Sequence, residues 1–315
     1  MRIRPLIALS AVALTGVLLA GCSGSTDGGS PSGSPSGVAA DLCGAAAPSG
    51  DASDAVTTDG ELGTEPTVTF TSPLEVTDVQ RSVAIEGDGE RIANGDFVQF
   101  AAKAYDGETG KEVASQGFEE GSMLPLQVSA DGYGRMFGCA TVGSRIVLAL
   151  PASEGSSSRV TVIDVLGITP TAAWGTPQDA PAGLPSVELA ENGAPTITIP
   201  DGDAPTKVEI ATLKKGDGPT VAQGDSVLVQ YTGVKWSDGS VFDSSWDRGA
   251  PASFQTTGVV AGFQQALEGQ TVGSQVLVVI PPEFGYGADE GNKLQKETLV
   301  FVVDILATQH VPAAE

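Results

Sequence analysis

The sequence predicts an α+β fold with two similar domains, each an antiparallel β-sheet wrapped around a short α-helix, preceded by a signal peptide and a disordered tether. Three observations predict this fold. The chain contains an internal repeat at an offset of about 130 residues, several near-continuous apolar runs typical of central strands, and one short stretch of helical periodicity. The length of 315 residues suits about two domains of ordinary size with connecting segments.

The charge balance excludes several classes of partner and site. The chain has 16 Lys and Arg residues against 39 Asp and Glu residues, which gives a formal net charge of −23. Such an acidic surface repels phosphate groups, so we expect neither nucleic-acid binding nor adhesion to anionic lipids through basic patches. One histidine and three cysteines are too few for a zinc site, a Ser-His-Asp triad or a Cys-His pair. We therefore expect no metal and no cofactor.

The N-terminus has the layout of an export signal. Two arginines among the first four residues precede an apolar run, residues 6–19, that is too short to span a bilayer comfortably. The run ends in Leu19-Ala20-Gly21-Cys22, which resembles the lipobox of bacterial lipoproteins, in which the cysteine carries diacylglycerol. We predict a signal peptide over 1–21 and a lipid on Cys22 that anchors the exported protein to the outer face of the cell membrane. The alternative is an ordinary secretory signal with a coincidental Cys22.

Residues 22–64 are rich in Gly, Ser, Pro, Asp and Ala. Such a segment buries too little apolar surface to offset the entropy of ordering it, so we predict a disordered tether. If Cys22 carries lipid, Cys43 and Cys139 remain. Disulfides persist outside the cytosol, so we predict a Cys43–Cys139 bridge, and the alternative is two unpaired thiols.

The internal repeat defines the two domains. The matched segments, in order, are 66–70 with 195–199, 87–89 with 216–218, 95–96 with 224–225, 141–144 with 271–274, and 160–166 with 300–306. The offset grows along the chain, so the second copy carries insertions. We predict domains over 65–170 and 194–310, joined by a Pro- and Ala-rich linker over 171–193.

Strands dominate the second copy. Residues 226–233 are rich in β-forming residues, and 275–280 and 299–306 are near-continuous apolar runs. One helix is expected where apolar residues recur at helical spacing, at Val259, Val260, Phe263, Ala266 and Leu267. Gly269 is a suitable stop for this helix.

The motifs of the second copy appear in an order that resembles a known family. They are Gly216-Asp217-Gly218, Val229-Gln230-Tyr231-Thr232-Gly233, Gly239-Ser240-Val241-Phe242-Asp243-Ser244-Ser245, Val259-Val260-Ala261-Gly262-Phe263, Phe284-Gly285-Tyr286-Gly287-Ala288 and Leu299-Val300-Phe301. With these motifs, residues 205–307 resemble an FKBP-type peptidyl-prolyl cis–trans isomerase. The first copy resembles a degenerate relative, so the chain resembles a bacterial lipoprotein with two FKBP-like domains.

The resemblance implies a set of site residues. The expected catalytic residues are Tyr231, Phe242, Asp243, Tyr286 and Phe301, and the expected substrate-binding residues are Phe254, Val259, Val260, Phe263, Arg248 and Leu294. The Val260 N–H and the Tyr286 hydroxyl would each anchor a substrate carbonyl. Asp243 would accept a hydrogen bond from Tyr231 and pair with Arg248.

The second copy departs from the family at two places. Phe263 stands where the family usually has tryptophan on the pocket floor. The segment 288–297 is shorter and more charged than the usual loop, with Leu294 in place of its apolar rim.

The implied reaction agrees with the composition. An X-Pro bond isomerises slowly because the amide loses resonance as it twists, and no proton transfer or covalent intermediate is needed. A dry aromatic pocket favours the twisted, less polar amide. The resemblance implies proline-containing unfolded or exported polypeptides as substrates and macrolides of the FK506 or rapamycin type as ligands.

The first copy lacks the implied chemistry. In the alignment of the two copies, Ala102 replaces Tyr231, Val113 replaces Phe242, Ala114 replaces Asp243 and Thr161 replaces Phe301. The Phe-Gly-Tyr-Gly turn has no counterpart in residues 152–156. We expect this domain to be catalytically silent.

Two other functions compete with an isomerase. A non-enzymatic chaperone or adaptor would keep the FKBP-like pocket for binding only. A solute-binding lipoprotein would share the lipobox and tether, but it predicts two α/β lobes with regular helical periods, which the sequence does not show.

Overall fold

The computed structural model describes residues 41–310. The predicted signal peptide over 1–21 and the predicted lipid attachment at Cys22 lie outside these residues. Within 41–310, none of the helices has the length and apolar character needed to cross a membrane.

The first domain is built on a sheet of six antiparallel strands in the order β3-β7-β8-β4-β5, with β6 pairing to β4. Its strands are β3 (Gln80–Ile85), β4 (Phe97–Asp106), β5 (Glu112–Gln116), β6 (Leu126–Gln127), β7 (Arg145–Leu150) and β8 (Arg159–Thr169). The helix α3 (Gly134–Phe137) contributes Phe137 to the buried cluster on one face of this sheet.

The second domain is built on a sheet of seven strands in the order β14-β13-β17-β16-β12-β9, with β15 pairing to β13. Its strands are β9 (Thr176–Pro177), β12 (Glu209–Lys215), β13 (Ser226–Lys235), β14 (Val241–Ser244), β15 (Ala252–Gln255), β16 (Gln275–Ile280) and β17 (Leu299–Gln309). The strands expected over 226–233, 275–280 and 299–306 are confirmed as β13, β16 and β17.

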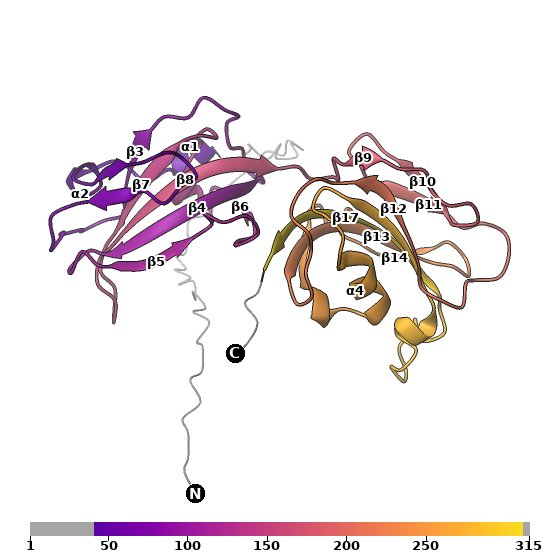
Figure 1. Ribbon diagram of the computed structural model, residues 1–315. Coiled ribbons are helices and arrows are strands. Elements are labelled where there is room, and N and C mark those ends of the chain that lie inside the picture. The colour runs from indigo at the N-terminus through magenta and orange to yellow at the C-terminus, as the bar shows by residue number, and fades with distance from the viewer. Residues whose placement is uncertain (1–40, 311–315) are drawn as a thin grey trace, which may run out of the picture. The chain divides into compact units, whose positions relative to one another are not determined.

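The predicted helix of the second domain is α4 (Ala261–Leu267), and the sheet curves around it (Figure 1). Phe263, Ala266 and Leu267 are its buried apolar residues, which explains the helical spacing in the sequence. A Cβ atom on Gly262 would lie 2.5 Å from the Ile280 side chain, so α4 approaches β16 this closely because residue 262 is glycine.

The two sheets repeat one strand order and the same irregularities. The order β3-β7-β8-β4-β5 corresponds to β12-β16-β17-β13-β14, and β6 on β4 corresponds to β15 on β13. The β4–β8 ladder shifts between Gln99 and Phe100, and the β13–β17 ladder shifts between Leu228 and Val229. Because the bulges coincide, the ladders show which residues of the two domains are equivalent.

The predicted domain boundaries at 65 and 194 are wrong, because each one separates two paired strands. β1 (Thr57–Asp59) pairs with β2 (Thr67–Thr69), and β10 (Ser186–Leu189) pairs with β11 (Pro195–Thr198). Ile197 of the second hairpin is buried with residues of β16 and β17, in a cluster separate from that of α4. Each repeat therefore begins with a hairpin, of which only the second strand has a recognisable sequence match.

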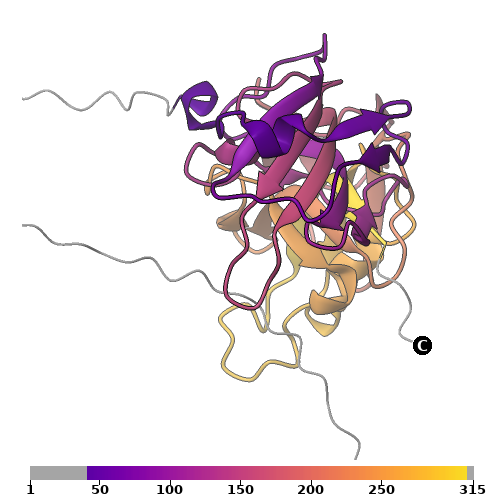
Figure 2. The same ribbon diagram turned by 90° about the vertical axis from the view of Figure 1, so that its left-hand side faces the viewer.

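The prediction of a disordered tether over 22–64 is wrong from residue 41 onward. Residues 41–56 form α1 (Leu42–Ala45) and α2 (Asp51–Asp54), which lie on the first domain (Figure 2, indigo). Leu42 is buried in the main cluster of that domain, and the Arg81 N–H of edge strand β3 donates to the Pro48 carbonyl at 2.9 Å. Burial of a few apolar residues and pairing with an open strand edge give this segment a defined structure, although its composition alone suggests disorder.

The predicted disulfide is present, between Cys43 in α1 and Cys139 after α3. It joins residues 41–56 to the body of the first domain.

The predicted linker over 171–193 contains β9 and β10 and packs on the second domain. Pro177 pairs with Lys214 at the edge of the sheet, and the Ala173 N–H donates to Asp304 Oδ2 at 2.9 Å. The segment protects an edge strand that would otherwise expose unpaired backbone groups.

A buried polar pair occupies the same ladder position in each sheet. Arg145 pairs with Asp164 between β7 and β8, and Gln275 pairs with Asp304 between β16 and β17. The Arg145 guanidinium donates to Asp164 at 2.6 and 2.7 Å, and the Gln275 amide donates to Asp304 at 2.7 Å. Burial raises the pKa of the Asp304 carboxyl, and the hydrogen bonds from the Ala173 N–H and Gln275 and the charge of Lys214 act in the opposite direction.

Candidate active site

Three buried aromatic rings from three elements meet in the second domain. Tyr231 comes from β13, Phe263 from α4 and Phe301 from β17, and each side chain is at most 5 % exposed. Their ring centroids lie 6.1 Å (Tyr231–Phe263), 5.0 Å (Phe263–Phe301) and 6.2 Å (Tyr231–Phe301) apart. Such tilted and edge-on contacts are favourable for aromatic pairs and hold the rings in fixed orientations.

A second group of apolar side chains is only half-buried and packs against these rings. Its members are Phe242, Phe254, Val259, Val260, Tyr286 and Leu294. They come from β14, β15, the approach to α4 and the segment between β16 and β17. The domain therefore presents apolar surface to solvent directly above an aromatic floor. Leu294 of the short charged loop belongs to this group, as the sequence suggested.

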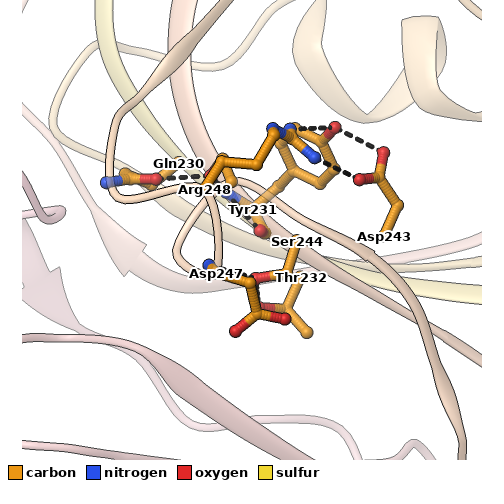
Figure 3. Close-up of polar contacts among 8 residues, drawn as sticks. Gln230, Tyr231, Thr232, Asp243, Ser244, Asp247 and Arg248 are labelled. Atoms are coloured by element: carbon orange, nitrogen blue, oxygen red, sulfur yellow. Dashed lines mark hydrogen bonds and ion pairs between the residues drawn. The ribbon is translucent and has the colours of Figure 1, made fainter.

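One wall of this aromatic cluster is polar (Figure 3). The Tyr231 hydroxyl donates to Asp243 Oδ2 at 2.6 Å, and Arg248 Nη2 donates to the Tyr231 oxygen at 2.7 Å. Arg248 also forms an ion pair with Asp243 and lies over the Tyr231 ring, 5.3 Å from its centroid. Burial, followed by the hydrogen bond to Asp243, raises the pKa of Tyr231 to about 12, so the phenol keeps its proton.

Two hydrogen-bond donors of the cluster have no partner among residues 41–310. The Val260 N–H stands at the start of α4, where φ is −62° and ψ is 147°, and it donates to no protein acceptor. The Tyr286 hydroxyl likewise makes no hydrogen bond within the described chain. Both donors can therefore serve a polar group that enters the cluster.

Comparison with known proteins gives the family. A profile described as FKBP-type peptidyl-prolyl cis-trans isomerase matches residues 218–306. A probable FK506-binding protein of Corynebacterium glutamicum is 40% identical over 114 residues, which cover 36% of this chain and 97% of that protein. An FK506-binding protein of Streptomyces anulatus is 38% identical over 118 residues, 36% of this chain and 95% of that protein. The chain belongs to the FKBP-type peptidyl-prolyl cis–trans isomerases.

The chain is also similar to a solved member of this FKBP family. The crystal structure of FkpA from Escherichia coli aligns with a TM-score of 0.32 and 30% sequence identity over 42% of this chain and 54% of that one. The family profile and the named isomerase relatives show that the protein is an isomerase enzyme, and the family match lies in its second domain.

The first domain does not carry the FKBP aromatic cluster. Its ladders place Ala102 opposite Ile163, as Tyr231 lies opposite Val303, and they place Ala104 opposite both Ala114 and Thr161, as Gly233 lies opposite Asp243 and Phe301. The sequence alignment of the two copies is thus confirmed at Ala102, Ala114 and Thr161. Small side chains stand where the second domain has Tyr231, Asp243 and Phe301.

Two residues that lie behind the polar wall were not among the site residues expected from the sequence. Gln230 and Ser245 are buried, and the Ser245 hydroxyl accepts a hydrogen bond from the Tyr231 N–H at 2.8 Å. The only available signal was the serine pair after Asp243, which indicates a turn and nothing more.

Metal-ligand residues do not gather around the FKBP cluster. Within residues 41–310, His, Cys, Asp and Glu side chains form no group of three or more that could hold a metal ion.

Proposed function

We propose that the second domain isomerises X-Pro bonds of exported polypeptides by a non-covalent mechanism at its aromatic cluster. The observation that supports this most is the half-buried apolar group above three buried rings, with two unpaired donors beside it. In this proposal the proline ring contacts Phe263 and Phe301, and the Val260 N–H and Tyr286 hydroxyl bind substrate carbonyls.

The proposed rate enhancement comes from the surroundings of the twisting amide. The barrier of about 18–20 kcal/mol reflects lost resonance, and the twisted amide is less polar than the planar one. Apolar rings stabilise the twisted form relative to water, and fixed donors hold the flanking carbonyls so that one end of the amide turns. The polar wall of Asp243, Tyr231 and Arg248 fixes the orientation of the Tyr231 ring.

A protease-coupled isomerase assay on the full chain tests this assignment. Tyr286→Ala removes both a donor and part of the apolar group, and we expect kcat/KM to fall about tenfold. Tyr133→Ala is the matched control, because Tyr133 is an exposed tyrosine of the first domain, and it should leave the rate unchanged. If the wild type binds a macrolide such as rapamycin but does not accelerate isomerisation, the binding-only adaptor is favoured instead.

We expect kcat/KM to be independent of pH between about pH 6 and 9. Tyr231 has its pKa raised to about 12, and hydrogen bonds to the Tyr231 phenol and to Asp243 raise the pKa of Arg248 above its usual value. A raised pKa keeps both groups protonated until the pH approaches that value, so Tyr231 stays neutral and Arg248 stays charged across this range. A bell-shaped rate profile centred near neutrality would indicate general acid–base catalysis and contradict the mechanism.

We also propose that the protein is exported and held on the outer face of the cell membrane by a lipid on Cys22. The lipobox-like end of the apolar run supports this, and so does the Cys43–Cys139 disulfide, since disulfides persist outside the cytosol. Cys22→Ala should move the protein from the membrane fraction to the soluble extracytoplasmic fraction, measured by fractionation and immunoblotting. Retention of the variant in the membrane fraction would count against the anchor.

Macrolides of the FK506 type are the proposed small-molecule ligands of the same cluster. The relatives from Corynebacterium and Streptomyces carry FK506 binding in their names. Phe263 on the floor keeps an aromatic face for such a ligand.

A further inference from the structure

We propose that Ser245 is a positioning residue of the isomerase: its buried hydroxyl, braced by Gln230, fixes the turn after β14 to the main chain of Tyr231 and thereby holds Arg248 and Asp243 on the Tyr231 phenol. The inference rests on the proposed function, because it assigns a role within that site. It concerns side chains that do not touch the substrate.

The contacts of Ser245 extend the β13–β14 pairing beyond its last ladder position. That ladder ends where Thr232 pairs with Ser244. One residue further, the Tyr231 N–H donates to Ser245 Oγ at 2.8 Å and the Ser245 N–H donates to the Tyr231 carbonyl at 3.0 Å. Ser245 therefore binds both main-chain groups of Tyr231, whose ring is one of the three buried rings of the aromatic floor.

Gln230 determines how the Ser245 hydroxyl points. Ser245 is fully buried and Gln230 is 4 % exposed, so water does not compete for their polar atoms. The Ser245 hydroxyl donates to Gln230 Oε1, and this leaves its lone pairs free to accept from the Tyr231 N–H. The Tyr231 carbonyl is a second, longer acceptor at 3.3 Å, so Gln230 Oε1 is the nearer acceptor that sets the direction of the hydroxyl proton.

The turn that Ser245 stabilises positions Arg248 at the polar wall. The Arg248 N–H donates to the Ser245 carbonyl at 3.2 Å, and the Asp247 N–H donates to Ser244 Oγ at 3.3 Å. The Arg248 side chain is half exposed, so its contacts with Tyr231 and Asp243 depend on where the turn places the Arg248 main chain. Loosening the turn would release the guanidinium to solvent and admit water to the phenol.

The first domain shows that these residues are lost together. Its ladders place Ala101 at the position of Gln230 and Gln116 at the position of Ser245, in the same register that has Ala102 for Tyr231. The domain that lacks the phenol and the carboxylate therefore also lacks the serine and its brace.

Ser245→Ala in the full chain tests the proposal against Ser274→Ala as a matched control. Ser274 is also fully buried, and its hydroxyl accepts a main-chain N–H, that of Gly216 at 2.9 Å, away from Tyr231. We expect Ser245→Ala to lower kcat/KM roughly tenfold and Ser274→Ala to leave it within about twofold, with similar losses of stability in urea. Equal kinetic effects of the two substitutions would overturn the proposal.

Two further measurements separate positioning from general destabilisation. In an Arg248→Ala background, Ser245→Ala should add less than about a twofold loss, because it acts through Arg248, whereas additive effects would refute that route. The pKa of Tyr231, followed by NMR of Cζ-labelled tyrosine, should fall from about 12 toward 10 in Ser245→Ala as water reaches the phenol.

The experiment stays decisive in two unfavourable cases. If Ser245→Ala does not fold, Gln230→Met removes the brace at similar volume, and we expect a fall of about threefold in kcat/KM and a lower Tyr231 pKa. If the wild type shows no isomerase activity, the proposed function fails, but the Tyr231 titration still tests the positioning role. An unchanged Tyr231 pKa in both variants would reject it.

Discussion

Val260→Pro lowers kcat/KM by about 10- to 100-fold while changing the free energy of unfolding by less than about 1 kcal/mol. The substitution removes one donor, the Val260 N–H, and replaces the valine side chain by the apolar ring of proline. Neutral hydrogen bonds contribute about 0.5–1.5 kcal/mol, and leaving a buried carbonyl unpaired costs about 1–3 kcal/mol, which gives the expected range.

The backbone at this position already suits proline. Val260 has φ −62° and ψ 147°, and Val259 before it has φ −113° and ψ 170°, the extended conformation that proline imposes on its predecessor. Since the Val260 N–H donates to no acceptor within residues 41–310, its removal costs no protein hydrogen bond.

Val260→Ala is the matched control for this experiment. It keeps the N–H and removes two methyl groups of a half-buried side chain, so we expect a loss of less than about threefold. Both variants are measured in the same isomerase assay and by urea unfolding. Equal losses in the two variants would mean that apolar contact, and not the N–H, accounts for the role of Val260.

The sequence predicts the central part of the second domain because its signals are local. Apolar runs such as 275–280 are buried on both faces, so composition alone marks them as strands. The aromatic cluster was predicted because its motifs have a fixed order, and the β-ladders then join Tyr231, Phe263 and Phe301 in space.

The features that the sequence did not predict are determined by distant partners. β1 and β10 are short and largely exposed, so their residues carry no apolar period, and only pairing with β2 and β11 makes them strands. The helices α1 and α2 have four residues each, too short to be stable alone, and they form because they pack on the first domain. In the sequence Ser245 is an ordinary turn serine, and only the structure shows its hydroxyl bound to the Tyr231 main chain.

Arg145→Ala lowers the free energy of unfolding of the first domain by about 3–5 kcal/mol, the largest effect on stability that we expect. Arg145 is fully buried and Asp164 is 1 % exposed, so the substitution leaves a carboxylate in the core without its cation. The guanidinium also donates to the Gly60 and Glu61 carbonyls at 2.9 and 3.0 Å, and both acceptors lose their donor.

The second domain contains the natural control for this substitution. Gln275→Ala removes a neutral amide from the equivalent ladder position, and we expect a loss of about 1–2 kcal/mol in that domain. Arg145→Gln should lie between the two, because glutamine can donate to Asp164 as Gln275 does to Asp304 but brings no charge. Urea unfolding resolves the three variants, and kcat/KM should be unchanged in Arg145→Ala because the aromatic cluster lies in the other domain. A loss no larger than that of Gln275→Ala would mean that Asp164 finds compensation from other groups, and that the ion pair is not what stabilises the first domain.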